Sequence, residues 1–150
     1  MRAAILACGL GVGLLALSSG LSPAHVGATG IVKERMDDMV KIGRAMKRIN
    51  ERLKSKRDLQ RIEQDAEEIR TAAIRMPSLF PAGSRDEHSE AKAAVWERWD
   101  DFVAGARLME SEAEKLAVAA RSGNDKAIAT QVGAVTRTCS ACHQTYKTKG

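Results

Sequence analysis

Residues 95–120, VWERWDDFVAGARLMESEAEKLAVAA, decide the fold class, because their apolar residues recur at steps of three and four. These apolar residues are Val95, Trp99, Phe102, Ala106, Met109, Ala113, Leu116 and Ala120. Steps of three and four place such side chains on one face of an α-helix, and no period of two runs through the segment. The segment therefore predicts one long amphipathic helix.

Three further segments show the same spacing of apolar residues, at positions 32–53, 59–76 and 128–146. Each stripe continues over several turns, which is typical of helices that pack at shallow crossing angles. Alanine, glutamate, lysine, arginine and methionine, all good helix formers, are plentiful along the chain. The four segments together predict an all-α fold with four long helices.

The links between these segments favour a bundle. Residues 55–58 form a short polar link, and residues 122–124 place a glycine after an expected helix end. Residues 77–83 contain two prolines and a glycine, which cannot continue a helix. Short first and third links join antiparallel neighbours, so we predict an antiparallel up-down-up-down four-helix bundle. We expect Ser84, followed three residues later by Glu87, or alternatively Ser89, to cap the third helix.

The first 28 residues have the layout of a secretory signal peptide. Arg2 precedes an uncharged apolar run at positions 3–17, and small and polar residues follow it. A permanent N-terminal anchor is the alternative, but the run is too short to span a bilayer; a lipoprotein signal at Cys8 is disfavoured because the run continues past that cysteine. We therefore expect residues 1–28 to be cleaved. Residues 29–150 would then form a periplasmic domain without a membrane span.

Composition limits the class of partner. The chain has 150 residues, of which 44% are hydrophobic and 29% charged, enough for one globular domain. Removal of residues 1–28 leaves 23 basic and 19 acidic residues, a net charge of +4 with alternating signs along the chain. Only five residues are aromatic, so nucleic-acid binding is not supported, and the core has room for another flat apolar group.

The pentapeptide Cys139-Ser140-Ala141-Cys142-His143 is a C-x-x-C-H sequence, the attachment motif of c-type haem. On a helix these two cysteines and the histidine lie on adjacent positions of one face. Both sulfurs can then reach one porphyrin edge while the imidazole comes under the iron. We predict one thioether-linked haem c per chain, held by Cys139, Cys142 and His143.

Three other interpretations of the two cysteines compete with haem. A zinc site needs four ligands, and the mature chain keeps no third cysteine. A thioredoxin-like dithiol needs a preceding strand and a parallel sheet, which the pattern does not predict. A plain disulfide suits an oxidising compartment but leaves the adjacent His143 unexplained. Haem is therefore favoured.

These features resemble the class II c-type cytochromes, the cytochrome c′ and cytochrome c-556 family. The likeness covers the whole mature chain. It includes Arg35-x-x-x-Met39-x-x-x-Gly43-x-x-Met46, Leu79-Phe80-Pro81, Val95-Trp96-Glu97-Arg98-Trp99-x-x-Phe102 and the haem motif near the C-terminus. Class I cytochromes place that motif near the N-terminus and do not fit. The resemblance implies that His143 is the proximal ligand and that Cys139 and Cys142 carry the thioethers.

The resemblance also places Met39 on the distal side of the haem. In the c-556 branch a methionine here binds the iron and gives a low-spin haem, whereas in cytochromes c′ the position is often apolar and the iron stays five-coordinate. Met39 is alternatively one core methionine among several, since methionines at helical spacing usually fill space. Met36 is a nearby competitor and departs from the glutamine common in the family. We expect Gly43 to let the porphyrin edge approach the helix.

The resemblance and the helical pattern also give expectations for six further side chains. The resemblance puts Arg35 near a haem propionate, with a solvated surface arginine as the alternative. Lys147 either weakens hydrogen bonding at the proximal histidine or caps the last helix. We expect Trp99 and Phe102 to be core residues, Trp96 to lie at a helix boundary and His88 to lie on the surface.

The expected function is electron transfer to and from redox partner proteins, with His143 and Met39 as axial ligands. The alternative is a high-spin cytochrome c′ that binds nitric oxide or carbon monoxide at an open distal face. Outside haem chemistry, the alternative is a bundle that binds partners or metal. No paired carboxylates converge on a pocket, so we do not expect an enzyme. Both a monomer and a homodimer are compatible with these heptads.

Overall fold

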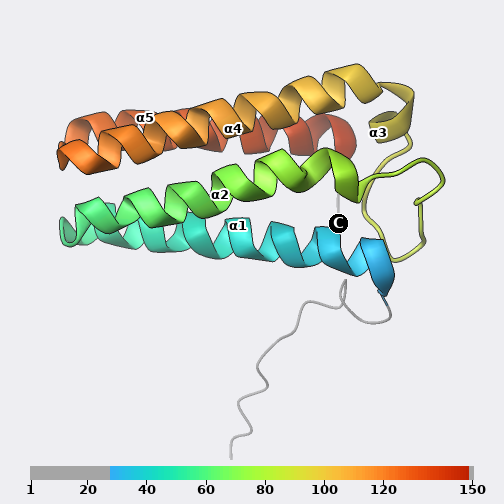
Figure 1. The fold of residues 1–150 in the computed structure, drawn as a ribbon, viewed down its shortest axis with the longest axis horizontal. Coiled ribbons are helices and arrows are strands. Elements are labelled where there is room, and N and C mark those ends of the chain that lie inside the picture. Colours follow the sequence, from blue (N-terminus) through green and yellow to red (C-terminus); the bar gives the residue numbers. More distant parts are fainter. Residues whose placement is uncertain (1–27, 149–150) are drawn as a thin grey trace, which may run out of the picture.

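A computed structural model describes residues 28–148, which form a bundle of four long helices (Figure 1). These are α1 (Gly30–Ser55), α2 (Ile62–Arg75), α4 (Trp99–Ser122) and α5 (Asp125–Tyr146). Successive long helices run in opposite directions along the bundle (Figure 1), which confirms the predicted all-α up-down-up-down topology. The signal-peptide prediction falls on residues of which all but Ala28 lie outside the described part.

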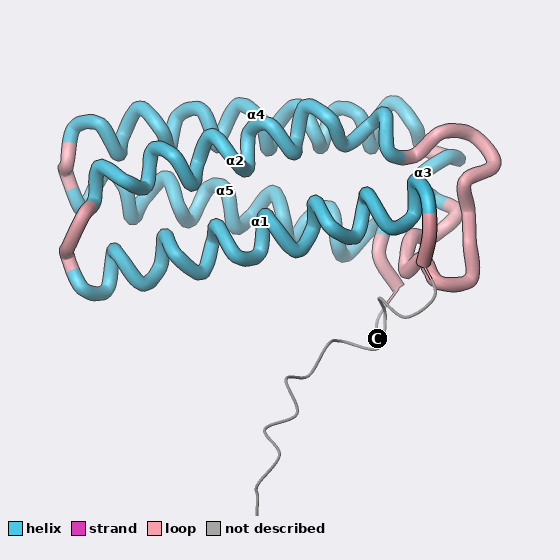
Figure 2. Tube along the Cα trace, turned by 60° about the horizontal axis from the view of Figure 1, so that its bottom comes forward, coloured by secondary structure: helices cyan, strands magenta, loops and turns pink. Residues whose placement is uncertain are grey.

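The short elements lie at the links between the long helices. They are the 3-10 turns η2 (Leu59–Arg61) and η3 (Met76–Leu79) and the single-turn helix α3 (Ala94–Glu97). Between residues 28 and 148 the structure has no β-strand (Figure 2). The one β-type pairing in this range is an isolated antiparallel bridge between Ala91 and Lys147. No helix in this range is long and apolar enough to cross a membrane.

One end of the bundle holds two tight turns, at residues 56–58 and 123–124, and is called the turn end below. Lys56 and Asp58 have φ values of 52°, and Gly123 ends α4 with a φ of 66°. Asn124 caps α5, since its side-chain oxygen accepts a hydrogen bond from the N–H of Ala127 at 3.0 Å. Both turns lie where the sequence predicts them.

The opposite end, called the loop end, holds the long connection 80–93 between η3 and α3. Here the sequence prediction was wrong in one respect, because neither Ser84 nor Ser89 begins a helix. Ser84 instead accepts hydrogen bonds from Arg35 through both its carbonyl and its hydroxyl oxygen. A tertiary contact to a buried arginine therefore replaces the expected cap.

The third predicted helix is interrupted once. Arg98 has φ −122° and ψ 50°, which separates α3 from α4. The Nε1 atom of Trp96 donates to the carbonyl oxygens of Phe80 and Pro81 at 3.1 and 3.0 Å, so this residue does lie at a helix boundary. The hydrogen bonds of Trp96 thus join the loop that begins at Phe80 to the segment just before α4.

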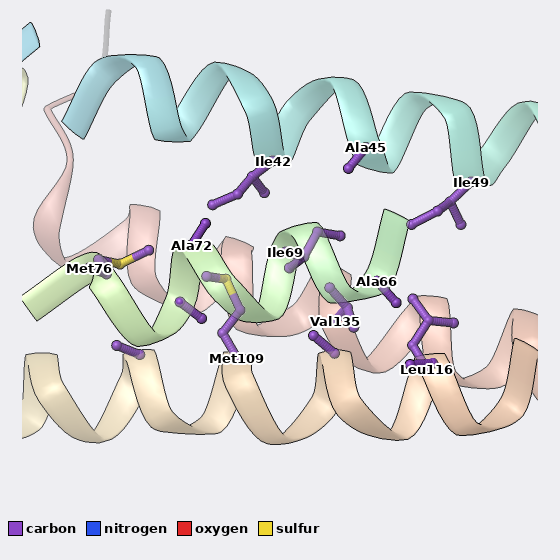
Figure 3. Close-up of a cluster of buried hydrophobic side chains, with 14 of the residues drawn as sticks. Ile42, Ala45, Ile49, Ala66, Ile69, Ala72, Met76, Met109, Leu116 and Val135 are labelled. Atoms are coloured by element: carbon purple, nitrogen blue, oxygen red, sulfur yellow. The ribbon is translucent and has the colours of Figure 1, made fainter. Parts of the chain in front are cut away.

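The four apolar stripes meet in one core (Figure 3). Helix α4 packs against α2 and α5, and α1 packs against α2. The large side chains that are fully buried are Ile49, Ile62, Ile69, Leu116, Ile128, Val95 and Val135. Most of them lie in the half of the bundle nearer the turn end. The half nearer the loop end holds two cavities.

Candidate haem site

Two adjoining cavities lie between α1 and α5, in the half of the bundle nearer the loop end. The outer cavity, which is nearer the loop end, has a volume of about 270 Å³, and the inner cavity has a volume of about 240 Å³. Four residues line both cavities: Met39, Met76, Cys142 and His143. The sequence motif on α5 and the methionine on α1 therefore border the same space, as the resemblance implied.

Helix α5 presents the C-x-x-C-H residues along one side of this space. Cys139 and Cys142 are half-buried and pack against the apolar core, and no disulfide joins them. Burial raises the pKa of both thiols. Spacings of three and four residues bring the two sulfurs and the imidazole of His143 to one face of the helix.

His143 lies close to the C-terminal end of α5, and part of its surface is exposed. Its pKa is lowered, first by desolvation and second by the positive charge of Lys147, while Glu90 acts in the opposite direction. Lys147 ends the helix, with its N–H donating to the carbonyl of His143 at 3.2 Å. Its side chain forms an ion pair with Glu90 at 2.9 Å. Lys147 thus caps the last helix and also places a charge beside the histidine.

Helix α1 lines the opposite side with three methionines. Met39 lines both cavities, whereas Met36 lines only the one nearer the loop end and Met46 only the other. Met76, which follows α2, lines both but is only 5% exposed and belongs to the core cluster. Sequence reasoning placed Met76 on the apolar stripe of the second helix, and nothing in its spacing distinguished it as a cavity residue.

Two glycines leave space along this cavity wall. Gly43 on α1 and Gly105 on α4 both line the inner cavity, and a Cβ atom at either position meets no other atom within 4 Å. The open space at Gly43 is compatible with the expected approach of the porphyrin edge to α1, which stays a prediction. A flat group can approach both helix backbones here, so the geometry fits a porphyrin.

Arg35 is the one buried cation at the site, with 3% of its surface exposed. Its Nη2 atom donates to the carbonyl and hydroxyl oxygens of Ser84 at 2.9 and 2.8 Å, and its guanidinium lies 4.4 Å from the ring centre of Phe80. Burial lowers its pKa, an effect that Asp86 partly opposes. The alternative of a solvated surface arginine was wrong. Its buried Nε atom has no hydrogen-bond partner, which suits a carboxylate-bearing ligand.

Three aromatic side chains, Phe80, Phe102 and Tyr146, line the outer cavity. Phe102 makes edge-to-face contacts with the other two, at ring-centre distances of 4.9 and 5.3 Å. Trp99 was expected in the core, but 37% of it is exposed and it lines neither cavity. The reason is that α4 begins at Trp99, at the end of the bundle, where the indole packs only partly on Phe102.

The rival interpretations of the two cysteines gain no support from the structure. In the part of the chain that is described, no three His, Cys, Asp or Glu side chains form a metal-binding group. The segment before Cys139 is helical, so the strand that a thioredoxin-like site requires does not precede it. His88 lies in an exposed loop, as expected.

Comparisons with known proteins show the family of this chain. Residues 30–147 match the family model described as Cytochrome C′. The chain is 35% identical over 132 residues to cytochrome c-556 of Agrobacterium fabrum, which covers 86% of this chain and 88% of that protein.

Two solved structures share the fold. One is a cytochrome c′ with ligand-controlled dimer dissociation (TM-score 0.74, 26% identity, 87% of this chain and 100% of that one). The other is the nitric oxide complex of a cytochrome c′ variant from Alcaligenes xylosoxidans (TM-score 0.73, 22% identity, 80% of this chain and 94% of that one). With its cysteines available for thioether linkage, the chain belongs to the cytochrome c′ family of electron-carrying haem c proteins.

Proposed function

We propose that this chain is a periplasmic carrier of single electrons, with one haem c linked to Cys139 and Cys142 and with His143 and Met39 as axial ligands. The observation that carries the proposal is that Met39 and His143 line both cavities from two different helices. A residue that borders both cavities lies near the middle of the combined space. This shared lining supports the assignment of the two side chains as an axial pair.

Haem iron supplies a one-electron couple between ferrous and ferric states, and a methionine ligand favours the ferrous form. His143 would supply an imidazole nitrogen, and its lowered pKa favours the neutral form, which is the one that binds metals. Met39 would supply its thioether from α1. Met36 and Met46 border one cavity each, so they are less suited to this role.

Arg35 would bind a haem carboxylate. Its Nε atom is buried without a hydrogen-bond partner, while Ser84 holds the other side of the guanidinium. A charge-assisted contact to a carboxylate would satisfy this remaining donor. The buried apolar side chains of Phe80, Val95 and Phe102 line the same cavity. A low local dielectric is one of the levers by which a protein sets a haem potential.

The second candidate function is binding of nitric oxide or carbon monoxide by a five-coordinate haem. The relative seen in complex with nitric oxide shares the fold, and the wall around Met39 is apolar, with Met36 and Val40 as its neighbours. If Met39 only fills space, this wall leaves an open apolar face for a small diatomic ligand. The two functions therefore differ in the ligation of one sulfur atom.

Cytochrome c′ proteins are periplasmic, which agrees with the signal peptide proposed for residues 1–28. The mass of the mature protein tests this cleavage, and a chain beginning near Ala28 or Thr29 is expected.

A homodimer is compatible with the fold, as the relative with ligand-controlled dimer dissociation indicates. Gel filtration of the holoprotein with and without carbon monoxide measures its oligomeric state.

The visible spectrum of the holoprotein, ferric and ferrous, with and without carbon monoxide, tests the proposal. Ligation by methionine predicts a low-spin ferrous spectrum that carbon monoxide leaves unchanged. A high-spin spectrum that changes readily with carbon monoxide contradicts methionine ligation and supports gas binding. A colourless protein from a host that matures c-type cytochromes contradicts both functions.

A further inference from the structure

We propose that Glu90 is a positioning residue that tunes the reduction potential of the haem by pairing with Lys147 beside His143 and offsetting its charge. This inference rests on the proposed function, because it concerns the electric field at the iron that His143 would bind. Glu90 lies in the loop 80–93, more than fifty residues before the histidine, so no sequence motif connects the two.

The three side chains share one cavity. Glu90, His143 and Lys147 all line the cavity nearer the loop end. The Nζ atom of Lys147 lies 2.9 Å from Oε2 of Glu90. Among the described residues that line either cavity, Glu90 is the sole carboxylate, and its charged neighbours there are the cations Lys147 and Arg35. Glu90 is therefore the one group of this lining that can offset positive charge next to the histidine.

The backbone holds Glu90 in place independently of its carboxylate. The carbonyl of Glu90 accepts from the N–H of Thr148 at 2.8 Å and from its hydroxyl at 3.2 Å. The N–H of Lys92 donates to the carbonyl of Tyr146 at 2.8 Å, and an antiparallel bridge joins Ala91 to Lys147. A change of the Glu90 side chain from carboxylate to amide leaves all of these contacts possible, so the charge can be removed while the end of α5 stays anchored.

Electrostatics gives the sign of each effect. Reduction of ferric to ferrous iron lowers the positive charge at the metal, so a nearby cation favours the reduced form and a nearby anion opposes it. Removal of the Glu90 carboxylate leaves Lys147 without its partner and should raise the potential. Removal of the Lys147 ammonium leaves Glu90 alone and should lower it. Removal of both should bring the potential back toward that of the native protein.

The experiment is a spectroelectrochemical titration of the native holoprotein and the variants Glu90→Gln, Lys147→Gln and the double variant. Glu87→Gln is the matched control, because Glu87 lies in the same loop, its side chain is 89% exposed and it lines neither cavity. Both partners of the Glu90–Lys147 pair are about two-fifths exposed, so salt should screen the effect. Titrations at low and high ionic strength therefore belong to the same series.

The proposal expects opposite shifts for the two single variants, a double variant that lies between them, and no shift for Glu87→Gln. The shifts should shrink at high ionic strength. An unchanged or lowered potential for Glu90→Gln overturns the proposal, as does a double variant that departs further from the native protein than either single one. The spectra recorded in the same titration report axial ligation separately, so a high-spin holoprotein would contradict Met39 ligation without altering the comparison of potentials.

Discussion

The two ends of the bundle use the same helical spacing to opposite effect. Toward the turn end, Ile49, Leu116 and Ile128 have no exposed surface, and the side chains fill the space between the helices. Toward the loop end, Gly43 and Gly105 leave open space along the same stripes. Figure 3 shows Ile49 and Leu116 on the first side and Met76 and Met109 nearer the second.

The apolar period fixes the helices, whereas the side-chain volume at each position decides whether the helices enclose a core or a cofactor cavity. Branched aliphatic residues without exposed surface fill the turn end, as expected of a close-packed interior. Glycine and flexible methionine at the loop end are compatible with a flat ligand that completes the packing. Stability and haem chemistry should therefore respond to changes at different ends.

The largest effect on stability is expected from Leu116→Ala, which creates a cavity at the packed turn end. Such a truncation costs about 2–5 kcal/mol of unfolding free energy. Urea unfolding of the holoprotein measures the loss, and the visible spectrum should stay unchanged because Leu116 lines neither cavity. Leu108→Ala on the same helix is the matched control, since Leu108 is 53% exposed and its loss should cost at most about 0.5 kcal/mol. A spectral change in Leu116→Ala would contradict the separation of the two ends.

A smaller loss is expected from Asp65→Asn, also nearer the turn end. Asp65 is 5% exposed and forms ion pairs with Arg48, at 2.6 Å, and with Arg52. The neutral amide leaves these two cations without their buried partner, which should cost about 1–3 kcal/mol in urea unfolding. Glu68→Gln removes a half-exposed partner of Arg48 and should cost at most about 1 kcal/mol. Equal losses in the two variants would show that burial of Asp65 adds nothing.

The helix fold, and part of the site, could be predicted from the sequence because local spacing encodes them. The stripes predict the four helices, and the C-x-x-C-H motif places both cysteines and His143 on one face. Glu90 could not be found, because its position depends on a bridge between a loop and the end of α5. Trp99 was misplaced because the break at Arg98 has no signal in the apolar period.

Paired glycine substitutions test whether the haem lies close to α1. Replacement of a helical glycine by alanine usually stabilises by up to about 1 kcal/mol. Gly133→Ala on α5 should show this gain in the holoprotein, since its Cβ meets only a side-chain atom of Arg137 at 3.5 Å. Gly43→Ala should gain less or lose stability, because the haem edge is expected in that space. An equal gain at both positions would contradict a close approach of haem to α1.

The smallest effect concerns pH. Glu112 on α4 accepts from Lys115 at 2.6 Å and from Gln131 on α5, and these contacts lower its pKa from the ordinary value. A carboxyl whose folded pKa is lowered stabilises the protein above its unfolded pKa, and this stabilisation is lost as pH falls through the folded value. The holoprotein should therefore lose stability below about pH 4.5, and Glu112→Gln should lose less over that range. Thermal unfolding at several pH values checks this, and parallel profiles would contradict it.

The most direct test of Met39 ligation is the spectrum of Met39→Leu, compared with Met36→Leu and Met76→Leu as matched controls. Leucine keeps the apolar volume and removes the sulfur, so stability should change little in the two controls. If Met39 ligates the iron, Met39→Leu alone should become high-spin and bind carbon monoxide in the ferrous state. In the ferric state it should lose the weak far-red absorption band that methionine–iron ligation produces. A Met39→Leu protein that stays low-spin and does not bind carbon monoxide would contradict ligation of the iron by Met39.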